Sequence, residues 1–313
     1  MKKWLIGIVF LFLLFSLCTS LLIPRKIFVS TLVTARTNQS ALHRFLSADS
    51  NWQKWWPASA SAKGSSILFE LDGYAFKKSK PLYNSFKIAI EKNNNIDSSL
   101  LGLFIVNKDS VKIEWSLTIE TGLSPFDKIR QYSRAKKIRQ ELEMILVAMQ
   151  NYVSDVKNVY GLDIRKELVK VEYLISAKKV FTHYPTTADV YEMVSQLKSY
   201  ITREQAKEED HPMLNINAAD SANFEAQVAI PIDKKLPDSG IFSSKRMLKN
   251  GNILVAEITG GNKMSALAMK QMELYVTDNQ YNNIAIPFYS LVTNRMTEKD
   301  SSKWVTRIYY PVM

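Results

Sequence analysis

IEWSLTIET, residues 113–121, alternates between apolar and polar side chains over its whole length. Because successive side chains of a strand point to opposite faces, its apolar set lies on one face. That set is Ile113, Trp115, Leu117 and Ile119. Such alternation predicts an antiparallel sheet with one face in water, and its dry face needs an apolar partner.

The segment that follows, residues 124–160, has the pattern of one long amphipathic helix. Ser124 can cap its start, Pro125 suits the first turn, and Asp127 favours the positive helix end. Apolar side chains then recur at steps of three and four, namely Ile138, Leu142, Ile145, Met149, Val153 and Val156. We expect a curved sheet to grip this helix along that stripe.

Residues upstream add strands and a short helix to the same unit. KIFVSTLVTA (26–35) predicts a strand, NQSALHRFLSA (38–48) a short helix, and NSFKIAIEK (84–92) a second alternating strand. NWQKWWP (51–57) places three of the chain's six tryptophans within five positions. Core packing explains them, since a buried Trp removes about 150 to 250 Å² from water. The rim of a pocket for an apolar ligand is the alternative.

Residues 4–23 form an uncharged apolar run with Lys2 and Lys3 before it. About 20 such residues can cross ~30 Å of hydrocarbon. Since no small-residue cleavage motif follows, we expect a retained transmembrane anchor over 1–26, with a cleaved signal peptide as the alternative. Basic residues flank both ends, so the orientation is weakly determined, and the soluble part is placed on the extracytoplasmic side.

The net charge of +11 raises the question of nucleic-acid binding. The densest basic group lies on the expected long helix and mostly off its apolar stripe: Lys128, Arg130, Arg134, Lys136, Lys137 and Arg139. A solvated helix face is the preferred interpretation, and contact with anionic lipid headgroups is the alternative. No recognition-helix or aromatic RNA-binding signature accompanies the cluster, so we expect no direct nucleic-acid contact.

The second half of the chain contains an approximate duplication. A strand within 170–184, a helix from Thr186 and two strands ending in FEAQVAIPI (224–232) form one copy. A strand at 251–259, a helix after Gly260 carrying Met264, Leu267 and Ala268, and two strands ending in WVTRIYYPV (304–312) form the other. We interpret them as two βαββ modules related by a pseudo-twofold axis.

The expected fold class is therefore α+β, with a transmembrane helix, a helix-grip antiparallel sheet domain and a duplicated βαββ domain. A length of 313 residues is typical of about two domains. We place the boundaries at 1–26, 27–161 and 162–313.

Catalytic and metal-binding motifs are absent from the sequence. It has no HExxH, paired CxxC, G-x-S-x-G or P-loop pattern, and it holds three scattered histidines and one cysteine. TGGNK (259–263) is interpreted as a tight entry turn rather than a phosphate site. We expect no metal, no cofactor and no catalytic set.

Aromatic and methionine side chains, interleaved with a few acids, are the chain's main candidates for function. Ligand pockets are mostly apolar with a few orienting polar groups, although each such residue can also belong to a core. The candidate ligand-binding residues are Trp52, Trp55, Trp56, Phe86, Trp115, Met213, Phe224, Tyr289 and Tyr309.

The order of segments over 27–160, with the tryptophan motif at 51–57, resembles the START/polyketide-cyclase-like (SRPBCC) superfamily. The resemblance implies a helix-grip fold with a deep hydrophobic cavity. It also implies that the tryptophans close the core and line the entrance of that cavity.

Residues 167–313 resemble the gyrase-inhibitor-like effector-binding domain of bacterial multidrug-responsive activators, through FEAQVAIPI, the Gly260 helix entry, IPFY (286–289) and KWVTRIYYPV (303–312). The resemblance implies a cationic or amphipathic ligand between the modules, held by a central Glu two positions after a Pro. Here that position is Tyr289, and Leu291 replaces an expected Tyr, so a neutral or amphipathic ligand fits better.

Together these observations predict a membrane-anchored, non-enzymatic sensor or carrier that binds hydrophobic or amphipathic small molecules in two domains. A cyclase or hydrolase acting on a small apolar substrate is the first alternative. A regulator that acts through a partner protein is the second.

Overall fold

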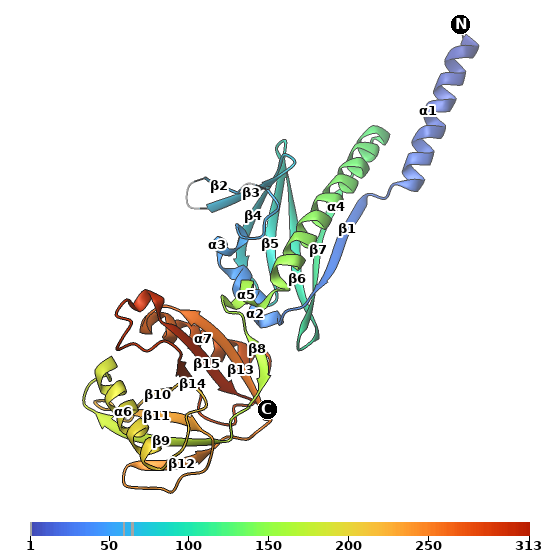
Figure 1. Cartoon of the computed structure of the whole chain (residues 1–313). Helices are drawn as coiled ribbons and strands as arrows, with labels where there is room; N and C mark the ends of the chain where they lie inside the picture. Colours follow the sequence, from blue (N-terminus) through green and yellow to red (C-terminus); the bar gives the residue numbers. More distant parts are fainter. Residues whose placement is uncertain (1, 59, 64–65) are drawn as a thin grey trace. The chain divides into compact units, whose positions relative to one another are not determined.

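The computed structural model describes residues 2–58, 60–63 and 66–313 (Figure 1). The chain forms two compact units, Met1–Val159 and Tyr160–Met313. Each unit contains one antiparallel sheet with helices, which makes the fold α+β. The first sheet has seven strands and the second has eight.

The first unit consists of the elements α1 (Lys2–Leu22), β1 (Lys26–Ala35), α2 (Gln39–Ser47), α3 (Asp49–Trp52), β2 (Ala60–Lys63), β3 (Ser66–Leu71), β4 (Tyr74–Pro81), β5 (Ser85–Lys92), β6 (Asn95–Asn107), β7 (Ser110–Glu120), α4 (Pro125–Val153) and α5 (Val156–Tyr160). The strand order is β1-β7-β6-β5-β4-β3-β2, so β1 closes one edge beside β7.

The alternating strand and the long helix form the core of this unit, as the sequence predicts. Ile113, Trp115, Leu117 and Ile119 of β7 are buried. Helix α4 packs on β1 and β7 (Figure 1). The predicted apolar stripe of α4 is buried from Ile138 to Val153 and belongs to the same hydrophobic cluster as β7.

Both ends of α4 differ from the prediction. The helix ends at Val153 rather than at residue 160. Asp155 interrupts it, because its carboxylate accepts a hydrogen bond from Lys157 N at 2.9 Å and so begins the separate helix α5. At the start, the Ser124 side chain makes no capping bond, and Asp127 accepts from Gly122 N instead.

The basic cluster of α4 is only partly a solvated face. Lys128 is buried, and its Nζ donates to the Ile23 carbonyl at 2.9 Å. Arg134 forms an ion pair with Asp97. The exposed members are Arg130, Lys136, Lys137 and Arg139.

Helix α1 precedes the first strand, and the Phe15 ring lies 5.9 Å from the Phe126 ring of α4. Among the described residues, no helix combines the length and the apolar character that a membrane crossing requires. The predicted anchor over 1–26 is therefore not supported by the fold and stays a proposal.

The second unit consists of the elements β8 (Arg165–Leu168), β9 (Tyr173–Phe181), α6 (Thr187–Arg203), β10 (Met213–Ala218), β11 (Phe224–Ile232), β12 (Phe242–Arg246), β13 (Asn252–Thr259), α7 (Asn262–Asp278), β14 (Phe288–Leu291), the 3₁₀ helix η1 (Ser301–Lys303) and β15 (Val305–Pro311). Its strand order is β12-β9-β11-β10-β14-β15-β13-β8.

This order shows the predicted duplication. The modules β9-α6-β10-β11 and β13-α7-β14-β15 meet where β10 pairs with β14, with Leu214 opposite Tyr289. Strands β8 and β12 were not predicted. Each precedes one module in sequence and pairs with the other, β8 with β13 and β12 with β9, so the edge strands are exchanged.

Candidate functional site

The three clustered tryptophans are core residues of the first unit. Trp52, Trp55 and Trp56 are all buried. The Trp52 and Trp55 ring centroids lie 5.0 Å apart, and Trp56 lies 5.1 Å from Phe69. Trp52 Nε1 donates to the Leu46 carbonyl at 2.7 Å, whereas Trp55 Nε1 has no hydrogen-bond partner among the described residues. The rings therefore fill space with one another.

Phe86 and Trp115 lie in the same packed interior. Trp115 Nε1 donates to Ser99 Oγ at 2.9 Å, and the Phe86 ring stacks on His43 at 5.1 Å. None of the five aromatic residues predicted in this unit lines the cavities described below. Their role in ligand binding stays a prediction.

One group of acids in the first unit has shifted pKa values. The carboxyl of Glu141 is buried, its Oε2 has no hydrogen-bond partner, and burial together with the nearby Asp72 raises its pKa. Burial likewise raises the pKa of Asp97, against the lowering effect of Arg134.

Among the described residues, no group of His, Cys, Asp and Glu could hold a metal ion.

The second unit is hollowed on the sheet face that α6 does not cover, here called the open face. A cavity of about 330 Å³, the open-face cavity, lies there. Met213, Phe288 and Met247 contribute to its apolar lining, and Gln227 and Lys245 to its polar lining. Its volume lies within the ~300 to 1,000 Å³ that is typical of small-molecule sites.

A smaller hollow of about 150 Å³ adjoins this cavity and shares Met213, Phe288 and Met247 with it. Tyr309 lines the smaller hollow, and its ring stacks on Phe288 at 5.1 Å. Burial raises the pKa of the Tyr309 phenol, which keeps it protonated. Two of the predicted residues, Met213 and Tyr309, thus lie at this pair of cavities.

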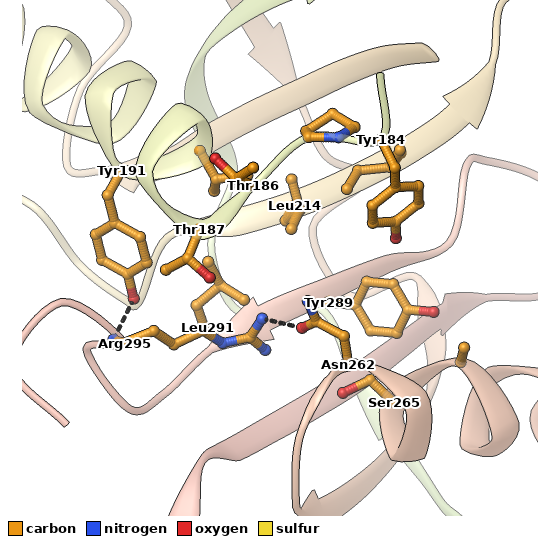
Figure 2. A pocket seen from close by; sticks show the side chains of 14 residues that line it. Tyr184, Thr186, Thr187, Tyr191, Leu214, Asn262, Ser265, Tyr289, Leu291 and Arg295 are labelled. Atoms are coloured by element: carbon orange, nitrogen blue, oxygen red, sulfur yellow. Dashed lines mark hydrogen bonds between the residues drawn. The ribbon is translucent and has the colours of Figure 1, made fainter. Parts of the chain in front are cut away.

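A second cavity lies on the opposite, helix-covered face, between the N-terminal ends of α6 and α7 (Figure 2). This helix-face cavity is small, about 40 Å³. It contains Tyr289, whose pKa burial raises to about 12. Figure 2 shows Tyr184 and Tyr289 on one side of it and Arg295 and Tyr191 on the other.

The two cavities are separated by the sheet itself. Side chains of neighbouring residues point to opposite faces of a strand. Met213 and Phe288 line the open-face cavity, whereas the next residue along each strand, Leu214 and Tyr289 respectively, lines the helix-face cavity. Leu214 is near enough to line both.

Arg295 is a site residue that sequence reasoning missed. Its guanidinium is buried, donates to Asn262 Oδ1 at 2.8 Å and to Thr306 Oγ1 at 2.9 Å, and lies 4.7 Å from the Trp304 ring centroid. It comes from an irregular loop segment, TNRMTEKD (293–300), and no periodicity distinguishes it from exposed arginines.

Phe224, the remaining predicted residue, lies beside the helix-face cavity. It is half-buried, and its ring meets Tyr184 edge to face at 5.5 Å. Tyr184 itself lines the cavity. Phe224 therefore packs behind Tyr184 and does not itself line the helix-face cavity.

No protein-family model matches the chain, and no curated protein matches it. Among solved structures, the chain is similar to EcmrR in its DNA complex, with a TM-score of 0.43, 14% identity, and 59% of this chain and 70% of that chain covered. It is similar to SAV2435 bound to tetraphenylphosphonium, with a TM-score of 0.31, 13% identity, and 48% and 94% covered.

A START superfamily protein from Mycobacterium smegmatis is also similar, with a TM-score of 0.30, 13% identity, and 40% of this chain and 97% of that chain covered. At these identities and TM-scores, the similarity carries no inference about a shared ligand.

Proposed function

We propose that the second unit is a binding module for hydrophobic or amphipathic small molecules and that its ligand occupies the open-face cavity. The observation that carries this proposal is the cavity of about 330 Å³ with a mainly apolar lining. Filling it with an apolar ligand removes both the ligand and the cavity wall from water, at about 25 cal/mol per Å². Methionine side chains such as Met213 and Met247 adapt readily to different ligand shapes.

Binding accounts for this unit better than catalysis does. A general acid or base needs a pKa near the working pH and a position facing the substrate. The groups with shifted pKa values at the cavities are Tyr289, Tyr309, Arg295 and Arg307, and each keeps its proton near neutral pH. We therefore propose a sensor or carrier in place of a cyclase or hydrolase.

The test is a titration of the full-length chain with the neutral dye N-phenyl-1-naphthylamine, followed by fluorescence. Ile286 lines the open-face cavity and is 53% exposed, whereas Ile284, in the same loop, is 43% exposed and does not line it. Ile286→Asp is expected to weaken dye binding about tenfold or more, because it places a charge at an apolar mouth. Ile284→Asp is the matched control.

Saturable binding by the wild type, lost in Ile286→Asp and retained in Ile284→Asp, is the expected result. A wild-type chain that shows no saturable response, or two variants that respond alike, would contradict the proposal.

Association of residues 1–26 with a membrane is a separate proposal. The described side chains of α1 include strongly exposed apolar groups, among them Trp4, Phe10, Leu11, Leu21 and Leu22. Exposed apolar surface of this kind favours a lipid or protein partner. Alkaline carbonate extraction of membranes from expressing cells tests it: the full chain should stay in the pellet, and a chain released to the supernatant would argue against a membrane anchor.

A further inference from the structure

Arg295 is a buried cation whose contacts are all to neutral groups. Arg295 is 8% exposed, and its guanidinium donates one hydrogen bond to Asn262 Oδ1 and one to Thr306 Oγ1. The titratable groups that act on it are the tyrosines 191, 184 and 289. Among the described residues, no carboxylate forms an ion pair with it. A buried charge normally has a counter-charge, because desolvation is costly.

Two hydrogen-bond donors at the helix-face cavity are unused. Arg295 Nε and Ser265 Oγ have no hydrogen-bond partner in the part of the chain that the structure describes, and both residues line this cavity. Ser265 is 5% exposed. Buried polar atoms are nearly always hydrogen-bonded in native structures, so two unpaired donors at one cavity indicate a missing acceptor.

The two helix ends at this cavity differ in how they are capped. Helix α6 has a complete capping box, in which Thr186 and Asp189 bond each other's backbone. Helix α7 begins after Gly261, has no side-chain cap and has no acidic residue in its first turn. Among the described residues, the cap and first turn of α7 therefore supply no negative charge to its positive end, and Ser265 lies on that first turn.

Acidic groups near the cavity do not replace the missing counter-charge. The Asp189 carboxylate is engaged by Thr186 and His183. Glu273 acts on the Tyr289 phenol from an exposed position. Tyr289, protonated near neutral pH, can itself donate a hydrogen bond.

From these observations we infer that the helix-face cavity binds a small oxyanion, a carboxylate or phosphate group, held by the guanidinium of Arg295 and the hydroxyl of Ser265 at the start of α7. The volume of about 40 Å³ admits a group of a few heavy atoms, such as one carboxylate or phosphate. Its charge is opposite to that of the cations expected from the effector-binding resemblance. The site does not depend on the proposed ligand of the open face.

The test measures the thermal unfolding of the full-length chain in sodium phosphate, sodium acetate or sodium chloride at equal ionic strength. A ligand that binds the folded state raises the melting temperature with concentration. We expect phosphate or acetate to raise it in a saturable way beyond chloride. Isothermal titration calorimetry with the same two anions then gives the dissociation constant.

Three variants assign the effect to the site. Arg295→Gln is expected to weaken anion binding about tenfold or more, since it removes the one charged side chain among the described residues that line the cavity. Ser265→Ala is expected to weaken it about threefold to tenfold while leaving the anion-free chain as stable or more stable, because an unpaired buried hydroxyl is removed. Arg203→Gln removes an exposed Arg at the C-terminal end of α6 and should leave the affinity for the anion unchanged.

The inference is overturned if neither anion stabilises the wild type more than chloride does. It is also overturned if the folded Ser265→Ala chain binds anion as tightly as the wild type and Arg203→Gln do. The comparison of Ser265→Ala with the wild type and Arg203→Gln tests the anion site even if Arg295→Gln does not fold.

Discussion

The two units differ in how their apolar side chains are packed. In the first unit, Trp52, Trp55 and Trp56 pack against one another and against Phe69 within the hydrophobic core. In the second unit, the open face of the central strands is covered only in part, and a cavity of about 330 Å³ remains. In this chain the clustered aromatic residues pack against one another, whereas the open-face cavity forms where a sheet face lacks a complete covering layer.

The largest effect on the free energy of unfolding should come from the tryptophan cluster of the first unit. Trp52→Ala removes a fully buried ring and is expected to lower the free energy of unfolding of the first unit by about 3 to 5 kcal/mol. Urea unfolding followed by circular dichroism measures it. Trp4→Ala, at a position that is 82% exposed, is the control and should change the free energy by under about 0.5 kcal/mol. A loss below about 1 kcal/mol for Trp52→Ala would mean that the tryptophan cluster is not a packed core.

The next effect concerns the helix-face cavity. Tyr289→Glu places a carboxylate where Arg295 lacks one, so the internal pair should replace the bound anion and weaken phosphate or acetate binding about tenfold or more. Tyr289→Phe keeps the ring without the charge and should weaken it much less. Calorimetry on both variants makes the comparison, and equal affinities in the two would contradict the proposed charge partner.

A smaller effect is expected at Glu141. Because burial raises its pKa in the folded state, its ionisation costs stability as the pH rises from 4.5 to the higher folded-state pKa. Glu141→Gln removes this cost, so the variant should be more stable than the wild type at pH 7. The difference should shrink as the pH falls towards 4.5, and thermal unfolding at several pH values checks both points. A variant less stable at pH 7 would show that the charged form is favoured.

The smallest effect is expected at the capped helix. Hydrogen bonds from Thr186 lower the pKa of Asp189 to about 2, so its stabilising contribution is present above pH 3.8 and is lost as the pH falls towards 2. Asp189→Asn should be slightly less stable than the wild type at pH 7, and the difference should shrink as the pH falls from 3.8 and vanish below pH 2. A constant difference across this range would exclude the capping box as the cause.

Much of the fold could be predicted from the sequence where the side-chain period is strong. The alternation in β7 and the stripe of α4, with Ile138, Leu142 and Ile145 buried, follow from local pattern alone. Helix α7 was less predictable, because Met264 and Leu267 are exposed while Ala268 and Met272 form its buried face. Strands β8 and β12 are short and polar, so local pattern does not predict them. Each pairs with a strand of the module that it does not precede, β8 with β13 and β12 with β9.

The candidate site was predictable only in part, for a physical reason. Met213, Tyr289 and Tyr309 line cavities, but whether an apolar residue faces a hollow depends on what covers it, which the chain's local pattern does not contain. Arg295 belongs to the proposed anion site because it is buried, and Ser265 because its hydroxyl has no hydrogen-bond partner within the described ranges of the chain. Both properties arise from segments that are distant in sequence.

Two separate ligand sites, one on each face of the eight-stranded sheet, are the central proposal for this chain. The most direct measurement is a titration of the full-length chain with N-phenyl-1-naphthylamine, without phosphate and with saturating phosphate. We expect saturable dye binding with the same dissociation constant, within about threefold, in both conditions. Absence of saturable binding, or displacement of the dye by phosphate, would contradict it.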